Sequence, residues 1–321
     1  MRTNNLYHTI AFYNLENLFD TKDDKHTNDD AFLPKSERNW TPRRYNKKLR
    51  KLGYTISNIG RDIAQKPPSI VGLAEVENKK VIEDLLNSKF LKSHHYQIVH
   101  FDSPDERGID VALIFDSKVF KLTHSEVYPV VLLDENGQPD YTRDILKVEG
   151  KLNNEKIYLL VNHWPSRRLG VDETEPSRIM VSKKVSEIIE QIQSIDTDPK
   201  IIIMGDFNDD PKSESVQRLI NSHDLFNPMQ QLISRDRGSL NHRFEWNLFD
   251  QIFFSTNFFE TKLDQHSYSK ADIFDDTFLT QYKGKYKGNP YRTYVGTKYK
   301  GGYSDHFPVY ILLKKNGALE F

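Results

Sequence analysis

Short apolar runs that end in acidic or polar residues constrain this 321-residue chain more than any other feature. The runs are rich in β-branched and aromatic residues, which is typical of buried strands. They lie at residues 9–13, 70–74, 96–100, 111–114, 146–149, 157–162, 201–204, 251–254 and 309–313. Some follow one another directly, and others are separated by amphipathic segments. That mixture predicts mixed sheets with outer helices, not a uniform alternation of strand and helix.

Four amphipathic segments are predicted to be helices, at residues 44–65, 81–91, 176–194 and 214–221. The first places Leu49, Leu52 and Ile56 at helical spacing. The chain shows neither an internal repeat nor a linker rich in Pro or Ser, so we expect a single domain over residues 1–321.

Two polar segments, 21–43 and 274–303, are expected to be long loops. The second interleaves lysines with tyrosines. Long loops inside a compact domain are usually functional or disordered.

Composition narrows the class of protein. The net charge is −1, so the whole chain is no basic nucleic-acid coat, and any attraction to phosphate must be local. The absence of cysteine excludes disulfides, thiolate catalysis and cysteine-based zinc sites. No apolar run approaches the roughly 20 residues of a membrane helix, and the N-terminus has no signal-peptide core. We expect a soluble monomer, cytoplasmic, or secreted if a signal peptide has been removed.

Acids and amides follow two of the predicted N-terminal strands. A rigid sheet aims side chains at such positions into one crevice. Asn14 and Glu16 are two residues apart, so on an extended strand they would point to the same face. Glu75 ends an apolar run, where a carboxylate is costly unless it is paired or binds a metal. The alternative is an acid at a helix N-terminus, a role that suits Glu77 and Asn78 better.

Histidines and further acids follow later strands. A lone histidine such as His163 is more often structural, but Arg167 and Arg168 just after it favour phosphate binding. Gly205 permits a sharp turn, after which Asp206 and Asn208 project from the strand end.

The dipeptide Asp305-His306 sets an acid beside a base before the last predicted strand. Asp250, at the start of the run 251–254, could orient a histidine, as carboxylates commonly do, or could be a plain turn residue.

In this order, the clusters resemble the endonuclease/exonuclease/phosphatase family. That family includes pancreatic deoxyribonuclease, apurinic/apyrimidinic endonucleases, inositol polyphosphate 5-phosphatases and bacterial sphingomyelinases. The resemblance runs from Asn14 to His306, and its specific motifs are Gly-Asp-Phe-Asn at 205–208 and Ser-Asp-His-Phe-Pro-Val at 304–309. The sequence Asn-His-Trp-Pro-Ser-Arg at 162–167 resembles a bacterial subgroup of that family.

The resemblance implies an α+β fold, a four-layer α/β/β/α sandwich of two mixed sheets with outer helices. It implies a metal ion, Mg²⁺ or alternatively Mn²⁺ or Ca²⁺, held by Glu75 with Glu16 and Asp305, and Asn14 beside it.

The resemblance also implies catalytic roles. Asp206 would orient or deprotonate the attacking water, and Asn208 would hold phosphate. His306 would pair with Asp250, and His163 would be the second histidine of the site. Arg143 aligns loosely with a phosphate-contacting group, and Arg167 is the nearby candidate for the same task.

These residue types suit phosphoester hydrolysis on chemical grounds. Carboxylates and amide oxygens bind hard cations, and histidines with a metal stabilise the developing negative charge. We expect a divalent-metal-dependent nuclease that acts on DNA or RNA, because the tyrosines and lysines of segment 282–303 could stack on bases and neutralise the backbone.

Three alternatives stay open. One is a phosphatase or phosphodiesterase acting on a small phosphorylated metabolite or a lipid headgroup. Another is a non-catalytic nucleic-acid-binding module on the same fold, which would have lost Asp206, Asn208 or His306, although all three are present. The last is an unrelated fold with structural acids. The net charge of −1 also argues against tight duplex binding.

Overall fold

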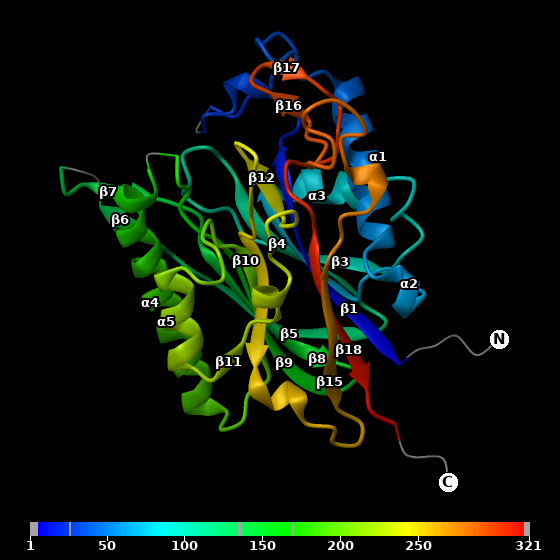
Figure 1. Cartoon of the computed structure of the whole chain (residues 1–321), viewed down its shortest axis with the longest axis vertical. Coiled ribbons are helices and arrows are strands. Elements are labelled where there is room, and N and C mark those ends of the chain that lie inside the picture. The colour runs from blue at the N-terminus through cyan, green and yellow to red at the C-terminus, as the bar shows by residue number, and fades with distance from the viewer. Residues whose placement is uncertain (1–5, 26, 134–135, 169, 318–321) are drawn as a thin grey trace.

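Two six-stranded sheets pack face to face, with helices on both outer faces (Figure 1). The computed structural model describes residues 6–25, 27–133, 136–168 and 170–317. This arrangement is a four-layer α/β/β/α sandwich, so the predicted fold class is confirmed.

The first sheet has the strand order β15-β18-β1-β2-β4-β3. Its strands are β1 (Tyr7–Leu18), β2 (Ile70–Val76), β3 (Tyr96–His100), β4 (Asp110–Asp116), β15 (His266–Ile273) and β18 (Val309–Lys315). β1 and β2 are parallel, and their other neighbours are antiparallel. The helices on its outer face are α1 (Pro42–Asn58), α2 (Arg61–Ala64) and α3 (Lys79–Leu86).

The second sheet has the order β11-β14-β10-β9-β8-β5. Its strands are β5 (Phe120–Tyr128), β8 (Ile145–Leu152), β9 (Glu155–His163), β10 (Ile201–Asp206), β11 (Leu225–Phe226) and β14 (Asp250–Ser255). Helices α4 (Val171–Ile195) and α5 (Glu214–Ser222) lie on its outer face.

Short elements fill the connections. Three hairpins pair β6 (Val131–Leu133) with β7 (Pro139–Tyr141), β12 (Leu240–His242) with β13 (Glu245–Asn247), and β16 (Tyr294–Val295) with β17 (Lys298–Tyr299). Single 3₁₀ turns are η1 (Asp30–Phe32), η2 (Pro228–Gln231), η3 (Thr256–Phe259) and η4 (Thr277–Leu279).

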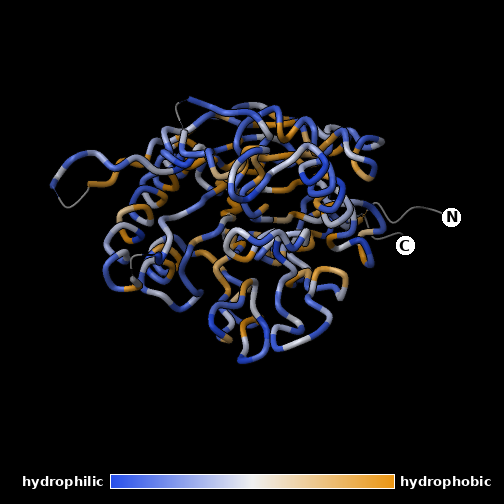
Figure 2. Tube along the Cα trace, turned by 90° about the horizontal axis from the view of Figure 1, so that it is seen from above, coloured by the Kyte–Doolittle hydropathy of each residue, from blue (hydrophilic) through white to orange (hydrophobic). Residues whose placement is uncertain are grey.

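The central strands of each sheet are buried on both faces, which explains why their sequences read as nearly continuous apolar runs. Phe12, Met204 and Phe254 belong to the core between the sheets. Leu52 of α1 and Ile188 of α4 belong to the two outer cores. Seen from above, many hydrophobic stretches lie in the middle of the molecule, and most of the outer loops are hydrophilic (Figure 2).

The predicted helix at 44–65 is shorter than expected. α1 ends at Asn58, because Gly60 takes a left-handed conformation (φ 64°) and turns the chain into the separate helix α2. Strands β5 and β15 were not predicted, because they lie at sheet edges and much of their surface is polar and exposed. In the described part of the chain, no helix has the length and apolarity to cross a bilayer.

Gly205 fixes the close approach of β10 to β9. A Cβ atom at this position would lie 2.4 Å from the carbonyl oxygen of Asn162 on the parallel neighbour. We expect Gly205→Ala to lower the free energy of unfolding by about 2 kcal/mol, because the neighbouring backbone has to move. Urea denaturation measures this, with Gly317→Ala as control, since a Cβ there meets no atom within 4 Å. Equal stabilities of the two variants would contradict the packing argument.

Candidate active site

The ends of strands from both sheets meet at one edge of the sandwich. Asn14 of β1 donates from Nδ2 to Oδ2 of Asp206 on β10, at 3.0 Å. Both side chains are buried, so this bond is made away from water. It brings the polar ends of the first sheet against those of the second.

Two histidines face the same carboxylate. Nε2 of His163, at the end of β9, lies 3.7 Å from Oδ2 of Asp206, and Nε2 of His306 lies 4.0 Å from that oxygen. His306 is oriented from its other side, because its Nδ1 contacts Oδ2 of Asp250 at 2.7 Å. The predicted pairing of His306 with Asp250 is therefore present in the structure.

Burial and charge set the protonation of this cluster. Burial raises the pKa of Asp206 to about 6, although His306 opposes the shift. The pKa of His306 lies well above its usual value: burial opposes this, but Asp250, Asp206 and Asp305 together outweigh it. Burial lowers the pKa of His163 well below the usual value, and Arg143 adds to the effect. These shifts favour a protonated His306 and a neutral His163 beside the carboxyl of Asp206, whose pKa is raised.

Asn208 reaches the cluster through a left-handed backbone (φ 48°). Its backbone N–H donates to Oδ1 of Asp206 at 3.0 Å, and its Nδ2 donates to the carbonyl of Trp164 at 2.9 Å. The same carbonyl accepts from Nη2 of Arg143, whose Nη1 donates to Asp105 at 3.1 Å. Asn208 and Arg143 therefore meet at the residue that follows His163.

Asn14 and Glu16 do not share a face, so the expectation from strand alternation was wrong. Glu16 and Asn17 both have a φ of 52°, and the pairing of β1 with β2 shifts register there. Strand periodicity holds only for extended backbone. Asn14 consequently points to Asp206, whereas Glu16 contacts Lys48, Arg292 and the backbone of Thr293.

The carboxylate of Glu16 binds a loop. It accepts hydrogen bonds from the backbone N–H groups of Thr293 (2.5 Å) and Tyr294 (3.2 Å). The buried Lys48 of α1 lies 3.7 Å from one of its oxygens and donates to its carbonyl. Its role as a metal ligand stays a prediction, and these partners favour anchoring of the loop instead.

The guanidinium of Arg292 contacts two of the predicted metal ligands, Asp305 and Glu16. Nη2 of Arg292 donates to Oδ2 of Asp305 at 2.5 Å, and Nε of Arg292 lies 3.7 Å from Oε1 of Glu16. Burial opposes ionisation of this guanidinium, but Asp305, then Glu16 and last Glu75 raise its pKa above the usual value. Oε1 of Glu75 lies 3.9 Å from Nη2 of Arg107. Carboxylate oxygens of this kind suit a hard divalent cation.

The predicted metal ligands do not form one tight set. In the described residues, Glu16, Glu75 and Asp305 are not among the groups whose ligand atoms lie within 4.8 Å of one another. The groups that meet this criterion are His100, Asp102 and Asp110, and Asp206, Asp250 and His306. Carboxylate oxygens of Glu75 and Asp305 suit a metal by their chemistry, but their role as its ligands stays a prediction. Arg292, which is bound to Asp305, is the charge that a metal would have to displace.

Arg167 lies apart from this position. Its Nε donates to Oδ1 of Asp209 at 3.1 Å, and its guanidinium covers the ring of Phe249. Its predicted role in substrate binding stays a prediction, and its partners favour a structural ion pair.

Sequence reasoning missed Lys48, Arg107 and Arg292. Arg292 had only a weak indication in the sequence: it lies in the basic loop, but it does not follow a predicted strand. Lys48 and Arg107 had none, because a cation in a helix or loop is usually solvated.

Loss of Arg292 should change metal affinity. We expect Arg292→Gln to tighten Mn²⁺ binding roughly tenfold, because the carboxylates lose their internal competitor; tenfold corresponds to about 1.4 kcal/mol. Isothermal titration calorimetry measures this without turnover. Lys298→Gln, an exposed cation in the same loop, is the control. Unchanged or weaker binding in Arg292→Gln would show that the guanidinium does not occupy the metal position.

Several solved structures share this fold. An endonuclease/exonuclease/phosphatase family protein from Bacteroides thetaiotaomicron has a TM-score of 0.59 at 16% identity, over 96% of this chain and 97% of that one. Truncated TDP2 from Caenorhabditis elegans has a TM-score of 0.59 at 15% identity, over 98% and 100%. The mannosyl-6-phosphatase Bt3783 of B. thetaiotaomicron has a TM-score of 0.58 at 17% identity, over 95% and 99%.

At such low identities, these TM-scores show a shared fold and nothing more. No curated protein matches the chain. A family model does match, over residues 9–315, and these residues include every strand end described above. The chain belongs to the endonuclease/exonuclease/phosphatase family.

Proposed function

We propose that this protein is a divalent-metal-dependent phosphodiesterase whose substrate is single-stranded nucleic acid. The observation that carries the proposal is the buried Asp206 carboxylate, held by Asn14 and faced by His163 and His306. Enzymes of this family hydrolyse phosphoesters with the help of a divalent metal ion.

Each residue has a chemical task in this proposal. Asp206 in its charged form orients a water molecule and accepts its proton. Protonated His306, fixed by Asp250, donates to a non-bridging phosphate oxygen or the leaving oxygen. Asn208, through its side-chain amide, and neutral His163 hold the phosphate.

The metal would be held by Glu75 and Asp305. When bound, it supplies Lewis-acid stabilisation of the charge that develops on the phosphate oxygens. Asn14 keeps Asp206 aimed into the site whether or not the metal is present, because the bond between them is buried.

An exposed group of rings and lysines supports a nucleic-acid substrate. We call Phe244, Tyr282 and Tyr286, with Lys283 and Lys285, the aromatic rim. Phe244 is 60% and Tyr282 is 73% exposed. The rings of Phe244 and Tyr286 stack with centroids 5.4 Å apart, and Lys285 lies 4.9 Å from the Tyr286 ring. Rings and cations together bind single strands with little sequence preference.

The aromatic rim is tied to the catalytic pair. Ser239, just before the β12–β13 hairpin that carries Phe244, accepts from the N–H of Asp250 and, through its carbonyl, from Phe307. Asn289 donates to Asn241, which joins the second half of the rim to the hairpin. The predicted stacking loop is therefore smaller than expected: Tyr294 and Tyr299 pack against each other and against arginines, and only the rim is open.

A second candidate is a phosphatase for a small phosphomonoester. Arg107 and Arg292 lie beside Glu75 and Asp305, and a terminal phosphate with its greater charge needs such added cations. The fold of the mannosyl-6-phosphatase Bt3783, which this chain shares, is compatible with this alternative.

A substrate panel tests the proposal. With Mg²⁺ or Mn²⁺, the protein should cut single-stranded DNA or RNA and bis-(p-nitrophenyl) phosphate, and EDTA should stop both reactions. Asp206→Asn should lower kcat by at least about a thousandfold, because it cannot accept the proton. Circular dichroism and thermal melting should show that this variant is folded.

The outcomes of the panel separate the candidates. Hydrolysis of sugar phosphates or p-nitrophenyl phosphate, with no cutting of nucleic acid, would replace the proposal by the second candidate. Equal turnover by the wild type and Asp206→Asn would overturn the site itself. Lys184→Gln, a surface change on α4, should leave every rate unchanged.

The pKa of Asp206 predicts the acid side of the pH profile. The active form is the carboxylate, so kcat/KM should fall about tenfold for each pH unit below the pKa of about 6. The protonated state of His306 should persist through neutral pH, because its pKa is raised. Initial rates on bis-(p-nitrophenyl) phosphate, quenched in base, measure the profile. Constant kcat/KM down to pH 4.5 in a protein that stays folded would contradict this assignment.

A further inference from the structure

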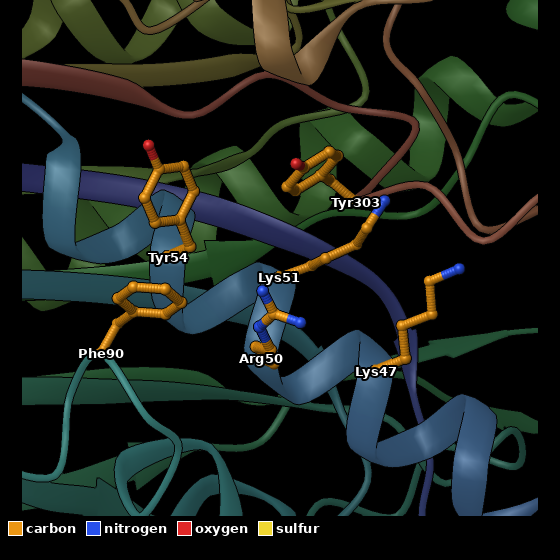
Figure 3. Close-up of a pocket in the computed structure, with 6 residues that line it drawn as sticks. All are labelled: Lys47, Arg50, Lys51, Tyr54, Phe90 and Tyr303. Atoms are coloured by element: carbon orange, nitrogen blue, oxygen red, sulfur yellow. The ribbon is translucent and has the colours of Figure 1, made fainter.

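A basic pocket lies outside the catalytic cluster, on the exposed side of α1 (Figure 3). Its cavity measures about 240 Å³. Four of its lining residues belong to α1 and repeat at helical spacing, and two come from other segments. They are Lys47, Arg50, Lys51, Tyr54, Phe90 and Tyr303.

The charge of this pocket has no internal compensation. α1 carries six cations and no acidic residue. In the described residues, no carboxylate forms an ion pair with Lys47, Arg50 or Lys51. Like charges three or four residues apart destabilise a helix. Burial, and then Lys47, Lys48 and Arg50, lower the pKa of Lys51 to about 8. A bound anion would reduce the repulsion among these positive charges.

The cations are held beside flat rings. Nζ of Lys51 donates to the carbonyl of Gly301 at 2.7 Å and lies 4.1 Å from the Tyr303 ring centroid. Tyr54 packs edge to face on Phe90, with centroids 4.9 Å apart, and is 37% exposed. An anion with an attached ring system would meet both features: phosphate at Lys47 and Arg50, and a base or sugar against Tyr54.

The size of the pocket favours the binding of one unit of a longer polymer. A pocket that encloses a whole small molecule is usually about 300–1,000 Å³, and this cavity is smaller. A single nucleotide unit with its remaining chain outside would fit such a space.

The pocket and the catalytic cluster share a segment of chain. Tyr303 lines the pocket, and Ser304 after it donates to the carbonyl of Asn14. Asp305 and His306 follow directly. On α1, Lys51 contacts this segment at Gly301, while the neighbouring Lys48 reaches Glu16. A chain that leaves the cleft across residues 301–305 would arrive at Lys47 and Arg50.

We propose that this pocket binds a nucleotide unit of a single-stranded nucleic-acid substrate, outside the phosphodiester that is cut. The inference rests on the proposed function, because it takes the same substrate. Lys47 and Arg50 hold the phosphate, Tyr54 supports the base or sugar, and Lys51 keeps the wall of the pocket closed against Gly301.

Oligonucleotide binding in EDTA tests the pocket without catalysis. Fluorescence anisotropy is measured with labelled single strands of 4 and 12 nucleotides over a salt series. For the 12-mer, Lys47→Gln/Arg50→Gln should weaken binding about tenfold and reduce the slope of log K against log salt by about 1.4, the value for two phosphate contacts. Tyr54→Ala should weaken binding roughly tenfold without changing the slope. The 4-mer should respond less.

Controls isolate the pocket from the catalytic cluster. Lys121→Gln/Lys183→Gln removes two exposed cations on β5 and α4 and should bind like the wild type. Lys47→Gln/Arg50→Gln should hydrolyse bis-(p-nitrophenyl) phosphate at the wild-type rate, since that substrate is too short to reach the pocket.

Three results would overturn the inference. If the wild type cuts single strands but Lys47→Gln/Arg50→Gln binds the 12-mer like the control, the pocket is not a subsite and the proposed function stands. If the wild type neither binds nor cuts nucleic acid, both fail. If the variant instead loses binding to phosphatidylserine vesicles while oligonucleotide binding is unchanged, the pocket serves a membrane surface.

Discussion

The hydrogen bond between Asn14 and Asp206 is the interaction on which the site depends, because it joins the two sheets at their polar edge. The central strands of both sheets are buried on both faces, so the polar side chains of these strands converge where the strands end. A buried carboxylate is costly without partners, and Asn14, the N–H of Asn208 and the two histidines provide them. Sheet packing and the chemistry of the site are thus stabilised by the same contacts.

Left-handed backbone at the strand ends decides where these side chains point. Glu16, Glu75 and Asn208 have φ values of 52°, 61° and 48°. Such conformations cost of order 1 kcal/mol or more for residues other than glycine, so surrounding contacts must hold them. Oε2 of Glu75 accepts from the N–H of Asn17 at 2.7 Å, and Asp206 accepts from the N–H of Asn208. The acids therefore stabilise the bends that orient them.

The fold and part of the site were predictable because they follow from local patterns. The apolar runs located most of the central strands, and His306 with Asp250 and Asp206 lie together as expected. The positions of Glu16 and of the loop tyrosines were not predictable. For Glu16, a bulge in β1 cancels the alternation of side chains along the strand. For the loop tyrosines, whether a ring packs on α1 or faces solvent depends on partners distant in sequence, such as Arg44 for Tyr299.

The cations of α1 explain why that loop packs where it does. Lys48 turns inward to Glu16 and Thr293, while Arg44 and Lys51 cover the rings of Tyr299 and Tyr303. A ring face and a carbonyl attract a cation without neutralising its charge. These contacts therefore fix the loop, while the surface of α1 stays positive. Lys47 lies over the same Tyr299 ring, and in the described part of the chain neither Lys47 nor Arg50 forms an ion pair with a carboxylate. Helix α1 therefore has two effects: it fixes the position of the loop at the cleft, and it makes the surface beside the cleft positive. A chain that carries phosphates would be attracted to such a surface.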